Sequence, residues 1–447
     1  MKKGIFLLAA SLLWASVTDN TFRLSYQNLK FQNEHMGLLE TSYLFNFGRF
    51  YTGLSVYSAV TGKRGGFFTG GVTLGYKLPV QKLYIDSGVF IGGGGGGHAP
   101  QGSGLMTKIY AGLLFPYHRY NLGININHVK FKDGEIDSTQ LGFIVDYNFK
   151  DIYLNSPKTV FGKYSLNHYI FRPYVSEYIP FDSKTTTGKK QKRFSLIGAE
   201  IIQKKENYFT FLNAAGAFHG DSDGYAEFLM GIGKNFKFLT VKTSLGAAGG
   251  GEVDTRGGFV YKIEAEKNIG FLNLSGGFFN APGGIKAYTL KAGINQKFSL
   301  ITTGKKYITY KPKKFEISIY SESYLPSSTI RKNGDSKRLD VLNVDIGVYK
   351  HKNIAYLVNA GAAYNGGSGG YAIGMFGVKY ARKYWFLSAY AGAGGGGRVD
   401  VGGGLIAKIK AGVSYKNLFA SIGRIKAING KLNTTTLSVG LKYDFYK

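Results

Sequence analysis

Residues Ala389 to Gly412 read AYAGAGGGGRVDVGGGLIAKIKAG, and this stretch decides how the rest of the chain is divided. More than a third of its residues are glycine, but it is not an isolated low-complexity segment. Related stretches occur twice earlier, as GAAGGGEVDTRGGFVYKIEAE at Gly246–Glu266 and as GGGGGGHAPQGSGLMTKIYAG at Gly92–Gly112. In each one, glycine is followed by a large apolar residue, two variable residues, lysine, isoleucine, one variable residue and alanine. Such recurrence predicts a fold built by repetition.

The lysines of this pattern are Lys108, Lys262 and Lys408, and their spacing sets the length of one repeat at roughly 150 residues. Each repeat divides into about eight strand-like segments separated by turn residues. The expected organisation, in chain order, is a signal peptide (Met1–Ala15), repeat 1 (Thr21–Phe149), a linker (Lys150–Leu166), repeat 2 (Asn167–Phe298), a second linker (Ser299–Lys314) and repeat 3 (Phe315–Lys447).

The strand-like segments alternate between apolar and polar residues, which places one kind on each face of a strand. In Leu405–Tyr415, leucine, isoleucine, valine and tyrosine share one face with alanine, whereas Lys408 and Lys410 share the other with Gly412 and Ser414. Strands of about ten residues with this pattern are typical of membrane β-barrels, and half-buried strands of soluble sheets alternate as well. The connections favour the barrel, because tight turns with a basic residue beside aromatics alternate with longer polar loops.

The N-terminus and the composition place the protein in the envelope. MKKGIFLLAASLLWAS begins with two lysines, continues with a short apolar run and ends in small residues, which predicts a secretory signal peptide. There is no cysteine, so disulfides, thiolate metal sites and cysteine nucleophiles are excluded. The formal net charge is +29, with basic residues spread along strands rather than gathered in one arm, so nucleic-acid binding is not expected.

The last strand resembles the sorting signal of Gram-negative outer-membrane β-barrels. Its residues Ser438 to Phe445 match a polar residue, any residue, Gly440, two variable residues, Tyr443, any residue and Phe445. The resemblance implies insertion into the outer membrane by the barrel-assembly machinery, with outer-membrane lipid and lipopolysaccharide as surroundings. Tyr446 and Lys447 follow the motif here, whereas many family members stop at the aromatic residue.

Two closures fit an all-β transmembrane antiparallel barrel made of three repeats. One is a single barrel of about 24 strands, and the other is three tandem eight-stranded barrels. An eight-stranded barrel is filled by side chains, whereas a large barrel leaves an aqueous channel. The lumen-facing candidates are Lys108, Lys262, Lys408, Lys410 and Lys442, and few acidic partners are evident in sequence. The alternative for Lys108, Lys262 and Lys408 is a solvated pore wall or pairing with carboxylates such as Glu264. Because unpaired buried charge is costly, these lysines favour the single water-filled barrel.

The function expected from this barrel is passive passage of small solutes through a cationic lumen that favours anions. The alternatives are a structural or surface-interaction protein that binds lipopolysaccharide or a partner, and a lipid-modifying enzyme. The seven histidines do not recur at one repeat position, and no cofactor, metal or catalytic motif is present, so we expect no enzyme. The glycine runs predict kinked hairpins or a small-residue patch that touches a loop or a partner. The residues do not specify the oligomeric state.

Overall fold

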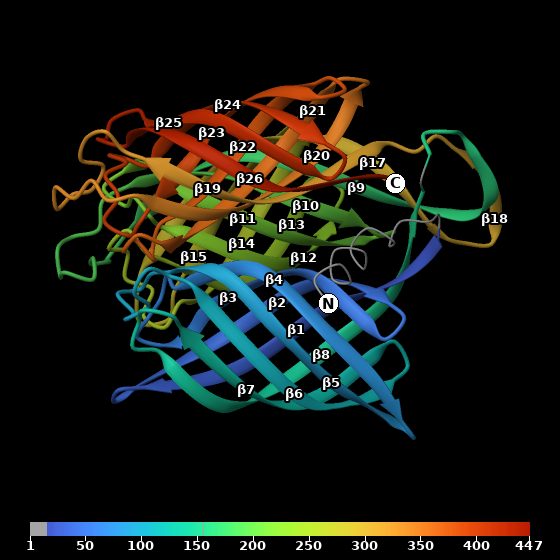
Figure 1. Cartoon of the computed structure of the whole chain (residues 1–447), viewed down its shortest axis with the longest axis horizontal. Coiled ribbons are helices and arrows are strands. Elements are labelled where there is room, and N and C mark those ends of the chain that lie inside the picture. Colours follow the sequence, from blue (N-terminus) through green and yellow to red (C-terminus); the bar gives the residue numbers. More distant parts are fainter. Residues whose placement is uncertain (1–15, 155) are drawn as a thin grey trace.

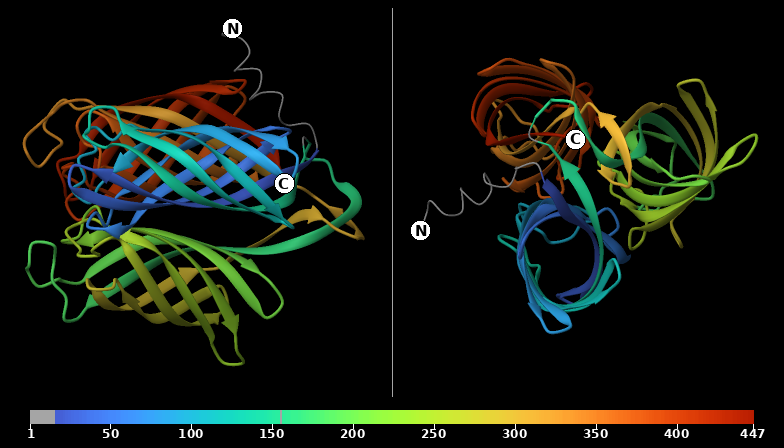
Figure 2. Two further views of the ribbon diagram at one scale, coloured as in Figure 1. Left: turned by 90° about the horizontal axis from the view of Figure 1, so that it is seen from below. Right: turned by 90° about the vertical axis from the view of Figure 1, so that its right-hand side faces the viewer.

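The computed structural model describes residues 16–154 and 156–447, all in strands, turns and loops. The expected signal peptide lies outside the described residues. No helix in the described part of the chain has the length and apolar character needed to cross a membrane. The strands form three rings that lie side by side around a common axis (Figures 1 and 2).

Barrel 1 is a closed ring of eight antiparallel strands in sequence order. Its last strand returns to its first, with Phe22 opposite Tyr147 and Ser16 opposite Tyr153. The strands are β1 (Ser16–Phe31), β2 (Glu34–Phe47), β3 (Phe50–Gly62), β4 (Phe68–Val80), β5 (Leu83–Gly95), β6 (Met106–Tyr117), β7 (Tyr120–Phe131) and β8 (Asp137–Tyr153).

Barrel 2 closes because β9 pairs with both β10 and β16. Its strands are β9 (Val160–Pro180), β10 (Phe194–Lys204), β11 (Tyr208–Gly220), β12 (Ala226–Asn235), β13 (Thr240–Gly249), β14 (Phe259–Ile269), β15 (Leu272–Asn280) and β16 (Lys286–Ile294). The first half of β9 projects beyond the ring and pairs with β17 (Gln296–Thr303) and β18 (Lys306–Tyr310). We call this two-stranded projection the ribbon; Figure 1 shows it at the right.

Barrel 3 is again a closed ring of eight strands. They are β19 (Lys314–Leu325), β20 (Leu339–His351), β21 (Ile354–Asn365), β22 (Ala372–Ala381), β23 (Trp385–Gly395), β24 (Leu405–Tyr415), β25 (Leu418–Ala427) and β26 (Asn433–Tyr446). The single barrel of about 24 strands is therefore wrong, and the alternative of three eight-stranded barrels describes the structure. The reason is long-range register: each group of strands pairs its last member with its own first member.

The two expected linkers are not free connections. Most of Lys150–Leu166 and Ser299–Lys314 belongs to the end of β8, the ribbon and the start of β19. Pro173, which has no N–H to donate, lies in β9 opposite the break between β16 and β17, where the ladder on that side is interrupted. Close to the ribbon, Leu154 and Tyr446 exchange backbone hydrogen bonds of 2.8 and 3.0 Å, which join barrel 1 to barrel 3.

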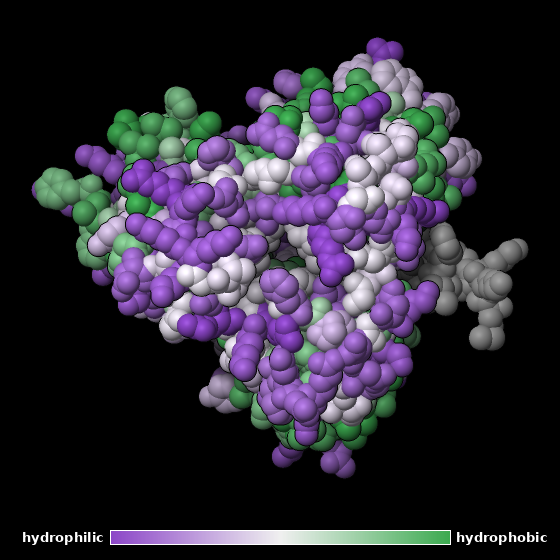
Figure 3. Space-filling model, turned by 90° about the vertical axis from the view of Figure 1, so that its left-hand side faces the viewer, coloured by the Kyte–Doolittle hydropathy of each residue, from purple (hydrophilic) through white to green (hydrophobic). Residues whose placement is uncertain are grey.

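The barrels have two different ends. At the turn end, nine hairpin turns of two to four residues connect the strands, at 48–49, 81–82, 118–119, 205–207, 236–239, 270–271, 352–353, 382–384 and 416–417. At the loop end, connections reach thirteen residues, in 181–193 and 326–338, and include the glycine-rich loops 96–105, 250–258 and 396–404. The loop end is largely hydrophilic, with apolar residues toward its perimeter (Figure 3).

Alternation decides which side chains enter each barrel. In β24, Lys408 and Lys410 are 1% and 3% exposed, whereas Ile409 between them is 60% exposed. Large apolar side chains cover the outside of barrels 1 and 2 as well, for example Ile126, Leu141, Ile232 and Leu290, each more than half exposed. A protein that puts charge inside and isoleucine outside is the reverse of a water-soluble sheet and matches a barrel surrounded by lipid.

Candidate functional site

The candidate site is the interior of the barrels, because the lysines expected to face a lumen lie there. Lys108, Lys262 and Lys408 are each 1% exposed. Lys410 is also buried, and Lys442 lies near the turn end with its side chain 16% exposed. The structure therefore places these residues inside the barrels, but it surrounds them with carboxylates rather than with an open channel.

In barrel 1, buried cations and anions alternate across the interior. Arg23 donates to Asp146 at 2.7 Å and forms an ion pair of 2.8 Å with Asp86. Lys108 Nζ lies 3.1 Å from Glu40 Oε2 and 5.0 Å from the centre of the Tyr57 ring. All of these side chains are almost fully buried, and the network offsets the cost of taking the charges out of water.

Barrel 2 holds the most extensive network. Glu200 accepts contacts from Arg172 at 2.8 Å, from Lys291 at 2.7 Å and from Lys242 at 2.5 Å. Lys291 also lies 2.8 Å from Glu264, the residue that Lys262 approaches at 3.5 Å. The cations and carboxylates come from β9, β10, β13, β14 and β16, so the pairs tie strands from all round the ring together.

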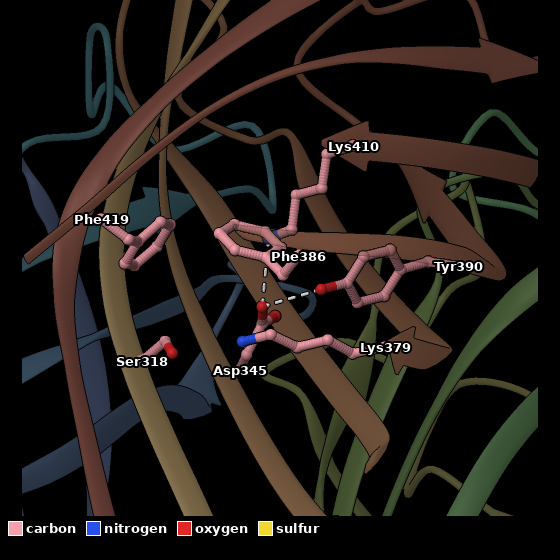
Figure 4. A pocket seen from close by; sticks show the side chains of 7 residues that line it. All are labelled: Ser318, Asp345, Lys379, Phe386, Tyr390, Lys410 and Phe419. Carbon is pink, nitrogen blue, oxygen red and sulfur yellow. Dashed lines mark hydrogen bonds and ion pairs between the residues drawn. The ribbon is translucent and has the colours of Figure 1, made fainter. Parts of the chain in front are cut away.

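Barrel 3 repeats the arrangement with simple pairs. Lys408 Nζ lies 3.0 Å from Glu322 Oε2, and Lys410 Nζ lies 3.1 Å from Asp345 Oδ2. Tyr390 donates to the same Asp345 carboxylate at 2.9 Å (Figure 4). Next to them is a cavity of about 10 Å³, which is roughly the space of one water molecule. A cavity of this size is not a passage for solutes.

Apolar layers close the interiors toward the loop end. In barrel 1 this layer includes Leu29, Phe31, Phe67, Phe90 and Phe131, none more than 3% exposed. Barrels 2 and 3 have equivalent buried clusters, which contain Phe194, Tyr225, Phe279, Tyr324, Leu339, Tyr371 and Ile406. Each interior thus combines a charged middle with an apolar layer nearer the loop end.

The expectation of a cationic lumen with few acidic partners is wrong. Glu264 lies two residues after Lys262 on β14 and was evident as a partner, whereas Glu40 in β2 and Glu322 in β19 stand on other strands than the lysines they pair with and were missed. A signal was present in the sequence, since an acidic residue in the middle of an alternating strand points the same way as the lysines. Its pairing partner depends on how the ring closes, which alternation does not reveal.

The glycine runs have a specific role in joining the barrels. A Cβ on Gly258 of barrel 2 would lie 2.3 Å from the Ala59 carbonyl oxygen of barrel 1, and a Cβ on Gly404 of barrel 3 would lie 2.3 Å from that of Ala217 in barrel 2. A Cβ on Gly104 of barrel 1 would lie 2.6 Å from the Ala363 oxygen in barrel 3. All three glycines have φ between +96° and +100°, a conformation that other residues rarely adopt.

These contacts form a closed cycle in which each barrel docks its glycine-rich hairpin on the next. The same type of contact used three times, head to tail, closes into a ring when the rotation permits. We call this set of loop-end contacts the glycine seam, defined by Gly104, Gly258 and Gly404 with their alanine partners. The expected small-residue patch therefore touches a neighbouring barrel of the same chain.

Polar contacts reinforce the seam. The Gly367 N–H of barrel 3 donates to the Ser103 hydroxyl of barrel 1 at 3.1 Å, and Ser103 in turn binds the Asp133 carboxylate. Partial burial acts to raise the pKa of Asp133, but the hydrogen bonds from Ser103 outweigh it and hold that pKa below its usual value. Lys332 of barrel 3 forms an ion pair of 3.0 Å with Asp223 of barrel 2.

One surface cluster contains the side-chain types of a hydrolase. On the outside of barrel 1, His128 Nδ1 lies 2.9 Å from the Thr139 hydroxyl, and its Nε2 lies 3.4 Å from Asp137. In a Ser-His-Asp site the acid is buried and serves the histidine. Here the Asp137 side chain is 49% exposed and shared with Lys130 at 2.8 Å, which is the geometry of a surface ion pair. Among the described residues, no group of three or more His, Asp or Glu could hold a metal ion.

The residues of the C-terminal motif lie in β26. A Cβ on Gly440 would lie 2.3 Å from the Tyr320 Cβ, so only glycine fits beside that ring. Phe445 stacks on Phe315, with ring centres 5.6 Å apart, and meets Tyr153 of barrel 1 edge-on at 5.5 Å. These contacts give the motif a packing role; its use as a sorting signal stays a prediction.

Comparison with known proteins gives no family. No family model matches the chain, and no curated protein matches it. Solved structures that align include OccK5 (OpdH) of Pseudomonas aeruginosa, at 10% identity over 98% of this chain and 99% of that one, with a TM-score of 0.22. The ferric enterobactin receptor PfeA of the same organism aligns at 9% identity over 97% and 81%, with a TM-score of 0.27. Scores this low carry no argument about the arrangement or the activity of this chain.

Proposed function

We propose that this chain is an outer-membrane β-barrel protein whose three barrels are sealed. On this proposal it is a structural or surface-interaction protein and not a pore. The observation that carries the proposal is the pairing of the buried cations: Lys108 with Glu40, Lys291 with Glu200, and Lys408 with Glu322. A solute that passed through any barrel would have to separate such pairs and cross an apolar layer.

The membrane location is supported by the outside of the barrels. Closed rings leave no unpaired strand edges in lipid, and exposed isoleucine and leucine side chains cover the outer strands. Short turns at one end and long polar loops at the other are the arrangement of outer-membrane barrels. The polar loop end shown in Figure 3 is the part that would meet lipopolysaccharide or a partner.

The passive pore remains the competing function, and solute uptake separates the two. Folded protein is reconstituted in liposomes, folding is checked by heat-modifiable gel migration, and swelling in isosmotic solutions of glycine, arabinose and sodium acetate is followed. The sealed-barrel proposal predicts the swelling rate of protein-free liposomes for all three solutes. Rapid swelling that increases with the amount of folded protein would overturn it and would restore the pore.

A further inference from the structure

The turn end of the three barrels carries a basic surface that the sealed-barrel function does not use. Each of the nine turns has at least one exposed Lys or Arg within three residues, for example Arg119, Lys237 and Lys383. Glu206 is the sole Asp or Glu within three residues of any of these turns. We call these nine turns with three residues on either side the turn-end rim.

The exposed cations of the turn-end rim have no carboxylate partner among the described residues. In the described part of the chain, none of them forms an ion pair within 4.0 Å. The loop end differs: Lys192 pairs with Asp221 at 2.8 Å, and Arg338 pairs with Asp340 at 2.8 Å. Exposed lysines without an ion pair also occur in the described loops, for example Lys184, Lys189 and Lys190, but the loops carry acidic residues among their cations, whereas Glu206 is the one acidic residue of the turn-end rim. The turn-end rim is therefore the more uniformly basic of the two ends and is suited to an anionic surface.

Aromatic side chains accompany the cations. Lys237 lies over the Phe238 ring at 5.4 Å, Lys383 over Tyr384 at 4.8 Å and Lys416 over Tyr415 at 5.5 Å. The three rings are 76%, 53% and 66% exposed. Aromatic belts lie at the headgroup level of a bilayer, so the cations beside them lie at the depth of the lipid phosphates.

The ribbon extends the same surface. Its two segments, 156–168 and 296–313, contain no Asp or Glu, whereas Lys163, Lys297, Lys306 and Lys311 are exposed on them. Lys163 lies over the Tyr307 ring at 5.3 Å, the same cation–aromatic pairing as in the turns. The ribbon leaves barrel 2 at the turn end (Figure 2), so its charge adds to that of the turn-end rim.

We propose that the turn-end rim binds the phosphate groups of anionic glycerophospholipids in the leaflet on that side of the bilayer. The lysine and arginine side chains supply the charge, and the adjoining aromatic rings hold them at the headgroup level. An acidic protein is the other class of partner, but the cations lie around all three barrels and are accompanied by exposed rings in barrels 2 and 3, which fits a continuous lipid surface better. The inference rests on the proposed membrane location.

The test uses the full folded protein in phosphatidylcholine vesicles that contain a small amount of spin-labelled lipid. Electron paramagnetic resonance measures the motionally restricted fraction of spin-labelled phosphatidylglycerol and of spin-labelled phosphatidylcholine, and their ratio gives the relative association constant. We expect phosphatidylglycerol to associate about threefold more strongly at low salt and equally in 1 M NaCl, because salt screens exposed charges. Equal association at low salt would overturn the inference and favour an acidic protein.

Matched variants place the effect at the turn end. The variant Lys205→Gln/Lys237→Gln/Lys267→Gln removes exposed charge from all three turn-end turns of barrel 2, and the control Lys184→Gln/Lys189→Gln/Lys190→Gln removes the same charge from its loop end. The turn-end variant should lose about a quarter of the selectivity, since it removes three of the thirteen exposed Lys and Arg of the turn-end rim, and the control should lose none. Equal losses would overturn the inference. Absence of any restricted lipid signal would instead contradict the membrane location itself.

Discussion

The pair Lys408–Glu322 distinguishes a sealed interior from a wet one. Both side chains are fully buried, with Nζ and Oε2 3.0 Å apart. The next carboxylate, Asp345, is already paired with Lys410 at 3.1 Å, so it is not free to replace Glu322. Glu322→Gln keeps the shape of the side chain and leaves the Lys408 charge without its partner. Removing one member of a buried pair costs ~3–5 kcal/mol of folding free energy.

Urea unfolding of the folded protein in detergent, followed by tryptophan fluorescence, measures this cost. Glu322→Gln/Lys408→Met is the control, because it removes both charges and should recover most of the loss. A water-filled lumen would hydrate Lys408, and the cost of Glu322→Gln would then be about 1 kcal/mol or less, as for exposed pairs. A loss that small would refute the sealed interior.

Three further predictions concern the seam, its pH dependence and the lipid-facing surface. Gly258→Ala should weaken the glycine seam by ~1–3 kcal/mol, because alanine is strained at positive φ and its Cβ would meet the Ala59 carbonyl. Spin labels on barrels 1 and 2 should then show a broader distance distribution. The control Gly374→Ala, which has open space around it, should leave that distribution unchanged. The contact between barrels 1 and 3 should also loosen in acid, because the lowered pKa of Asp133 contributes stability that is present above its unfolded-state pKa and is lost as pH falls through the folded-state pKa. The distance distribution between spin labels on barrels 1 and 3 should therefore broaden below about pH 4, and Asp133→Asn should abolish that pH dependence. Ile409→Lys should destabilise the protein by ~2–4 kcal/mol if the middle of β24 faces lipid, and the same urea assay in vesicles tests it; a neutral result would contradict membrane embedding.

The strands were predictable from the sequence because alternation is a local property. The segment Leu405–Tyr415, expected from alternation, has the bounds observed for β24. The exposure of Ile409 between two buried lysines follows from the same period of two. Short turns and long loops at opposite ends were also visible, since turn residues carry local signals.

Closure was not predictable, because it depends on pairing between residues more than 100 positions apart. Phe22 meets Tyr147, and Ile319 meets Leu441, and no local pattern specifies these partners. For the same reason, the lysines wrongly favoured a single barrel over three. Glu322 lies 86 positions before Lys408, so the charge balance of each interior became visible only after the ring had closed.

The glycine runs show a different limit. The recurrence of Gly104, Gly258 and Gly404 was evident in the sequence, and its cause was not. Each glycine allows close approach to a carbonyl group of the next barrel, at Ala363, Ala59 and Ala217. A glycine indicates that another chain segment approaches its backbone closely, but it does not indicate which segment approaches. Knowledge of three separate rings is needed before the contact can be recognised as barrel to barrel.

Single-channel recording tests the central claim most directly. Folded protein is inserted into a planar bilayer in 1 M KCl, and the current is recorded across a range of voltages, with the number of inserted molecules estimated from heat-modifiable protein in the same preparation. Sealed barrels predict a baseline current without steps, both for the natural sequence and for Lys184→Gln/Lys189→Gln/Lys190→Gln. Regular conductance steps that change size or ion selectivity with Lys408→Glu would contradict the account and would show that ions pass through the interior of barrel 3.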